Sequence, residues 1–123
     1  MKYRLLFFIF LLVVIFYITN TRGTNQVTVT ISMDHHQNQI IEKKLPLKDD
    51  RTVLDIMVHY FDVQTIFHGE VFTSINGIKN NEKDKLGWFY TVNGKEPMVT
   101  PRELKLKPGD HIEFDYHHYY SPN

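Results

Sequence analysis

The sequence predicts an α+β fold, in which a β-grasp-like mixed sheet packs on one helix and an N-terminal signal or anchor helix precedes it. Three observations lead to this fold class. Residues 5–18 are almost entirely apolar, segments of alternating polar and apolar residues lie near both ends of the remaining chain, and a single segment, 53–61, has helical spacing.

The N-terminal segment has the layout of an export signal. Lys2 and Arg4 precede the fourteen uncharged residues Leu5 to Ile18, and polar residues follow. The apolar run is slightly shorter than the roughly 17–20 residues of a membrane-spanning helix. We therefore keep two alternatives, a cleaved signal peptide ending near Gly23 and a retained anchor formed by residues 5–18. Either one predicts an extracytoplasmic domain, secreted or anchored to the cell membrane.

The charge balance limits the kinds of partner. Fourteen Lys and Arg balance fourteen Asp and Glu, but Lys2, Arg4 and Arg22 belong to the N-terminal segment, which leaves 11 against 14 in the exported part. This excess of acid disfavours nucleic acid, which requires a basic face. The chain has no Cys, so it has no disulfides and no thiol chemistry.

Two strands are expected to open the domain. Residues 26–32 alternate strictly and place Val27, Val29 and Ile31 on one face. Residues 40–47 form the second strand of the predicted hairpin, after a polar turn over residues 33–39. Pro46 cannot donate a hydrogen bond to a neighbouring strand, so we expect this second strand to lie at an edge.

One amphipathic helix follows. Thr52 and Asp55 resemble a capping box at its start. The apolar residues at helical spacing, which we expect to face a sheet, are Val53, Leu54, Met57, Val58 and Phe61.

Short strands complete the domain. Residues 71–75 and 88–92 are strand-like, and each ends at an Asn-Gly pair that suits a two-residue hairpin turn. Residues 107–110 form a Pro-Gly turn before the last strand, 111–116. The predicted organisation is a signal or anchor with a short linker over residues 1–25, one domain over residues 26–117, and a tail over residues 118–123.

Three sequence blocks resemble a known family. TSINGIK (Thr73 to Lys79), GWFYTVNGKEP (Gly87 to Pro97) and LKPGDHIEF (Leu106 to Phe114) are similar to DUF4430, a bacterial extracytoplasmic domain related to the C-terminal β-domain of transcobalamin and intrinsic factor. The resemblance covers roughly Val27 to Tyr116. It implies a β-grasp-like fold and a surface that binds a cobalamin-like corrinoid or another flat cofactor. The family often has a second Trp where Phe89 stands.

The first candidate site is an aromatic surface. Trp88, Phe89 and Tyr90 are consecutive, so alternation sends Trp88 and Tyr90 to one face of the strand and Phe89 to the other. The sequence leaves open which face is buried. If the Trp88 face is free, it can stack on a flat ligand, and we predict ligand-binding residues Phe72, Trp88, Tyr90, Pro97 and Met98.

The second candidate site is a metal site made from two His-His pairs. His35 and His36 lie in the first turn, and His117 and His118 follow the last strand. The two pairs converge if the first and last strands are neighbours, with Asp34 or Asp115 as a further ligand. Imidazole ligands favour Zn, Cu or Ni. The alternative interpretation is that these His are solvated residues at strand ends.

No sequence motif indicates a catalytic site. The serines lie outside any G-x-S-x-G context, and no Gly-rich phosphate loop follows a strand. We therefore predict a non-enzymatic extracytoplasmic ligand-binding module, with no cofactor assigned. The alternatives are an accessory domain that docks on a partner protein of a membrane transport system, and a His-mediated metal-binding protein.

Overall fold

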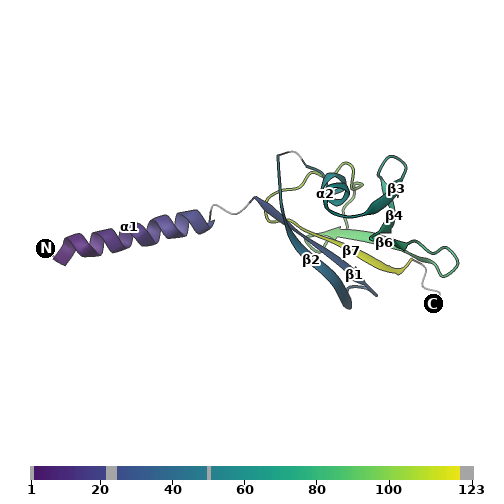
Figure 1. Cartoon of the computed structure of the whole chain (residues 1–123), viewed down its shortest axis with the longest axis horizontal. Helices are drawn as coiled ribbons and strands as arrows, with labels where there is room; N and C mark the ends of the chain where they lie inside the picture. Colours follow the sequence, from purple (N-terminus) through teal and green to yellow (C-terminus); the bar gives the residue numbers. More distant parts are fainter. Residues whose placement is uncertain (1, 22–24, 50, 120–123) are drawn as a thin grey trace.

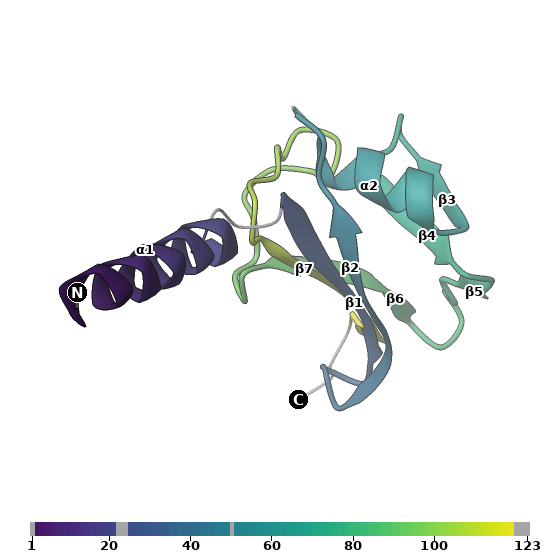
Figure 2. The ribbon, with the colours of Figure 1, turned by 60° about the vertical axis from the view of Figure 1, so that its left-hand side comes forward.

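The structure, a computed structural model, describes residues 2–21, 25–49 and 51–119. Figures 1 and 2 label the elements along the chain. In sequence order they are α1 (Lys2–Thr21), β1 (Gln26–Met33), β2 (Asn38–Pro46), α2 (Val53–Tyr60), β3 (Val63–Ile66), β4 (Val71–Ile75), β5 (Ile78–Lys79), β6 (Leu86–Val92) and β7 (His111–His118).

The strands form two sheets. The larger sheet has the order β2-β1-β7-β6, and the smaller has the order β3-β4-β5. β1 and β7 are parallel, whereas the other neighbours are antiparallel. Figures 1 and 2 show α2 and the smaller sheet over one face of the larger sheet. The predicted α+β class with a mixed sheet and one packed helix is thus confirmed, and the separate small sheet is an addition.

The hydrophobic core lies between the larger sheet and its cover. The alternation predicted for β1 is confirmed, because Val27, Val29 and Ile31 are all buried. The other buried apolar residues come from β2, α2, β4, β6, β7 and the loops: Leu45, Val53, Ile56, Met57, Phe61, Phe72, Ile75, Trp88, Leu106, Ile112 and Phe114. The face of β1 and β7 that points away from this core is polar.

The capping box at the start of α2 is confirmed. The Thr52 hydroxyl accepts a hydrogen bond from the Asp55 amide, and the Asp55 carboxylate accepts one from the Thr52 amide. The predicted apolar face is wrong at one position, since Val58 is 57% exposed, and Ile56 is buried in its place. The core therefore lies against a slightly rotated face of the helix.

The edges of the larger sheet are β2 and β6. β2 is an edge strand, as Pro46 indicated, and β6 forms the opposite edge. Both Asn-Gly pairs adopt left-handed backbone conformations, with φ of 50° and 84° at Asn76 and Gly77. β3 was not predicted.

The N-terminal apolar segment is helical over its whole length, in α1. Within the residues that the structure describes, no helix combines the length and the apolar character needed to cross a membrane. The predicted cleavage region, residues 22–24, and residues 120–123 of the predicted tail lie outside the described residues.

Candidate functional site

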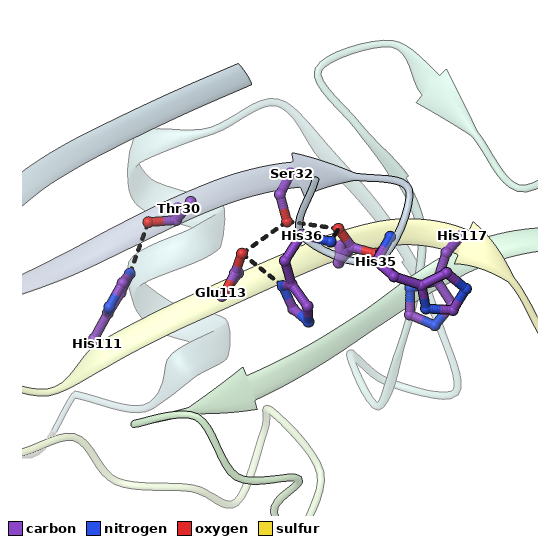
Figure 3. Close-up of polar contacts among 8 residues, drawn as sticks. Thr30, Ser32, His35, His36, His111, Glu113 and His117 are labelled. Atoms are coloured by element: carbon purple, nitrogen blue, oxygen red, sulfur yellow. Dashed lines mark hydrogen bonds and ion pairs between the residues drawn. The ribbon is translucent and has the colours of Figure 1, made fainter. Parts of the chain in front are cut away.

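The turn between β1 and β2 meets the end of β7 because β1 and β7 run in parallel. In their register Ser32 lies opposite Asp115, and Met33 lies opposite Tyr116. The Asp34 amide continues the pairing by donating to the Tyr116 carbonyl at 3.0 Å. The predicted convergence of the first His pair and the last strand therefore occurs, and Figure 3 shows His35 beside His117.

Asp115 is the centre of this cluster. It is only 1% exposed. Its Oδ1 accepts hydrogen bonds from the Ser32 hydroxyl at 2.6 Å and the His36 amide at 2.8 Å. Its Oδ2 accepts one from the His35 amide at 3.0 Å and contacts Nδ1 of His117. The carboxylate thus joins β1, the turn and β7.

These contacts keep Asp115 ionised. Burial on its own raises the pKa of the carboxyl group, but hydrogen bonds from Ser32, His117 and the His36 amide favour the charged form, as does the proximity of His117. Their combined effect exceeds that of burial, and the pKa of Asp115 is lowered from its usual value. The site therefore contains a fixed negative charge.

The turn that carries the first two histidines has an unusual backbone. Asp34, His35 and His36 have φ of 56°, 57° and 68°, in the left-handed region. Such a conformation costs roughly 1–2 kcal/mol per residue that is not Gly. Strain of this kind persists where surrounding contacts fix the backbone, and the two amides held by Asp115 do so here.

His117 lies within a stack of three rings. Its ring is nearly parallel to that of His35, with centroids 4.1 Å apart, and to that of Phe89, with centroids 4.3 Å apart. Two parallel neighbours this close must occupy opposite faces of the His117 ring. Donor atoms of His35, Asp115 and His117 all lie within 4.8 Å of one another, so these three residues could hold a metal ion. We call them the His-Asp cluster.

The other predicted histidines lie outside this cluster. Nδ1 of His36 lies 2.6 Å from the Glu113 carboxylate, which also contacts the Ser32 hydroxyl at 2.9 Å. His118 is exposed and, by alternation along β7, points to the opposite face from His117. His111 lies at the start of β7, where Nε2 lies 2.7 Å from the Thr30 hydroxyl. The structure thus brings together one histidine of each predicted pair.

The aromatic residues of β6 divide as alternation predicts. Trp88 is buried on the core side, where Nε1 donates to the Ile78 carbonyl at 2.9 Å. Tyr90 is half-buried on the same side and donates its hydroxyl to the Val99 carbonyl. Burial, together with the nearby charge of Glu103, raises the pKa of Tyr90 to about 12. Phe89 is on the outer face and is 39% exposed.

The predicted aromatic surface is therefore mostly interior. Phe72 is 4% exposed and packs on Phe114 with ring centroids 4.7 Å apart, so it belongs to the core. Met98 is fully exposed, and Pro97 is half-buried. A shallow cavity of about 320 Å³ remains at the β6 edge, lined by Trp88, Phe89, Tyr90, Glu96 and Pro97.

Sequence reasoning missed Ser32, Glu113 and Phe89. One available signal was the alternation of His111, Glu113, Asp115 and His117 along β7, which places four ionisable side chains on the face opposite the core residues Ile112 and Phe114. An outer sheet face that carries so many ionisable residues beside the buried hydroxyls of Thr30 and Ser32 is a candidate binding surface.

Comparison with family models identifies the family of this chain. Residues 50–118 match the model described as Domain of unknown function (DUF4430). The chain belongs to this family. The match confirms the resemblance inferred from the three sequence blocks. It includes Asp115 and His117 of the DUF4430 domain, whereas His35 lies before the matched residues.

Two solved structures have a similar fold. A crystal structure from Ruminococcus gnavus, described as a "putative metal binding protein", has a TM-score of 0.58 and 16% identity, over 78% of this chain and 99% of that one. Haptocorrin in complex with Cbi has a TM-score of 0.61 and 15% identity, over 79% of this chain. The matched region is 26% of haptocorrin, about a quarter of its length. None of the curated proteins matches the chain.

Proposed function

We propose that this DUF4430 domain is a non-enzymatic binding module for a transition-metal ion, held at the His-Asp cluster. The observation that carries the proposal is the placement of donor atoms from His35, Asp115 and His117 within 4.8 Å of one another. Two imidazoles favour Zn²⁺, Cu²⁺ or Ni²⁺ over Ca²⁺ or Mg²⁺. The similar Ruminococcus gnavus structure, by its description, supports the same class of ligand.

The N-terminal segment supports a position outside the cytoplasm. Its charged start and apolar run are typical of an export signal or anchor. We accordingly propose that the module captures metal at the outer face of the membrane or in the surroundings of the cell. N-terminal sequencing of the chain recovered from culture medium and from membranes would separate secretion from anchoring.

Calorimetry tests the metal proposal directly. Zn²⁺ and Cu²⁺ are titrated into the untagged protein and into His117→Ala and His118→Ala variants. The His118 variant is the matched control, because it removes the neighbouring imidazole that lies outside the cluster. We expect wild type and His118→Ala to bind alike and His117→Ala to bind at least about tenfold more weakly. Equal weak heats from all three proteins would remove the proposal.

A second candidate ligand is a flat organic cofactor at the edge of β6. The haptocorrin complex with Cbi supports it, as does the cavity beside Trp88 and Tyr90. Tyr90, Pro97 and Met98 remain the predicted contacts. Because Trp88 is the single Trp, its emission reports on this edge. Unchanged emission with cobalamin, cobinamide and haem would count against this candidate. Docking of the same edge on a transport protein remains the alternative.

A further inference from the structure

The hydrogen bonds of Asp115 use its whole capacity as an acceptor. An ionised carboxylate offers about four lone-pair positions. Oδ1 receives the Ser32 hydroxyl at 2.6 Å and the His36 amide at 2.8 Å. Oδ2 receives the His35 amide at 3.0 Å and contacts Nδ1 of His117. A metal bond to Asp115 would therefore displace one of these donors.

The same contacts determine which nitrogen of His117 is available. An ionised carboxylate can only accept, so Nδ1 of His117 carries the proton in this contact, and in the neutral ring the lone pair lies on Nε2. A carboxylate that holds the far nitrogen of a metal-binding imidazole is a recurrent arrangement in metal sites, where it fixes the ring and increases its basicity. The rings of His35 and Phe89 hold the two faces of His117.

We propose that the His-Asp cluster supplies only two ligands, the imidazoles of His35 and His117, and that it takes a metal ion already bound to a small chelator. Asp115 is then a positioning residue. This inference rests on the proposed function. Zn²⁺ prefers four ligands, and Cu²⁺ or Ni²⁺ four to six, so two imidazoles leave positions that another molecule must fill.

The surroundings agree with an incomplete site. His36, the nearest further imidazole along the chain, faces Glu113 through Nδ1 at 2.6 Å and is not among the converging donors. His35 is exposed, so the solvent side of the pair is open to a bulky complex. Two neutral donors cannot compete for a metal ion with a multidentate chelator. They can add to the complex by filling two adjacent positions once the exposed His35 ring turns from its stacked position on His117, because stacked rings do not direct their lone pairs at one ion.

Chelators with different numbers of donors measure how many ligands the protein supplies. Nitrilotriacetate fills four of the six positions of octahedral Ni²⁺ and leaves two, whereas iminodiacetate fills three and leaves three. Binding of both complexes to the untagged full chain is measured by calorimetry. Binding of free imidazole to the same two complexes serves as the reference. Imidazole has a single donor, so the ratio of its two affinities reflects the difference in charge between the complexes and not the number of open positions. We expect the two affinities, relative to imidazole, to agree within about threefold.

The possible outcomes separate this inference from the proposed function. If Asp115 is a third ligand, the nitrilotriacetate complex loses one bond and binds about tenfold or more weakly than the iminodiacetate complex, which overturns the two-ligand site but keeps metal binding. If neither complex nor hydrated Ni²⁺ binds, the proposed function fails as well. His35→Ala should weaken binding of the nitrilotriacetate complex about tenfold or more, and His118→Ala should leave it unchanged.

The positioning role of Asp115 has a separate readout in ¹⁵N NMR of the ring nitrogens. We expect Nδ1 of His117 to be protonated in wild type, and the diamagnetic Zn²⁺–nitrilotriacetate complex to shift the Nε2 signal. Asp115→Asn should redistribute the proton between the two nitrogens. If that variant does not fold, Ser32→Ala provides the test, because it keeps the carboxylate and should keep the proton on Nδ1. Loss of the Nδ1 proton from wild type on adding the complex would overturn the assignment.

Discussion

Replacing Asp115 by Ala should destabilise the domain far more than any other single change on the outer face of the larger sheet. The change removes the acceptor of four contacts. The buried Ser32 hydroxyl still has the Glu113 carboxylate as an acceptor, at 2.9 Å. The cost therefore comes mainly from His117 and the two turn amides, which lose a buried acceptor, and each bond to a charged acceptor is worth about 1.5–3 kcal/mol. Hydration of the exposed turn amides offsets part of this, and we expect a decrease of about 3–5 kcal/mol in the free energy of unfolding.

Urea unfolding followed by Trp88 emission measures this effect, since the single Trp is buried at the edge of the core. Glu113→Ala is the matched control. It removes a half-buried carboxylate from the same face of β7, with contacts to Ser32 and His36, and should cost less than about 1 kcal/mol. Equal losses of stability from the two substitutions would refute the inference that the contacts of Asp115 stabilise this face more than those of Glu113.

Three further predictions concern backbone strain and burial. Gly69→Ala should cost about 1 kcal/mol more than Gly77→Ala in urea unfolding, because both have left-handed φ but only at Gly69 would the new Cβ lie 2.3 Å from a Leu54 methyl carbon. His35→Gly should be more stable than His35→Ala by about 1 kcal/mol, because the backbone of residue 35 is left-handed and Gly adopts that conformation without strain. At ordinary positions Ala is the more stable of the two, and both variants should lose metal binding equally. Tyr90 should ionise near pH 12, which gives a late step in the titration of the tyrosinate ultraviolet signal. That step should be missing in Tyr90→Phe. Its raised pKa makes the folded state lose stability as pH rises from about 10, the ordinary value, to about 12, and Tyr90→Phe should flatten that decline.

Local sequence signals predicted the elements that local physics determines. The alternation in β1 and β7, the capping box of Thr52 and the two Asn-Gly turns all have causes within a few residues. β3 has only four residues and no turn signal directly before it, and so its sequence does not distinguish it from a loop. The rotated face of α2 depends on which side chains the sheet accommodates, and helical spacing did not determine this.

The order of strands depends on distant contacts. Nothing near β6 indicates that it lies at an edge, because that position follows from the parallel pairing of β1 with β7. The same pairing brings His35 to His117, and the sequence could state this only as a condition. The roles of Ser32 and Glu113 could not be predicted, because a buried hydroxyl between two carboxylates is a property of the assembled sheet.

The pairing of β1 with β7 also has a consequence for how the domain folds. Residues that meet at the candidate site, such as His35 and Asp115, are 80 positions apart in the chain. Contacts of such long range form slowly, because the intervening chain must first lose its freedom. During synthesis the β1–β2 hairpin emerges long before its parallel neighbour, and the His35 and His36 amides of its turn lack their carboxylate acceptor until β7 arrives. Capture of a metal complex by this module would therefore report that folding is complete.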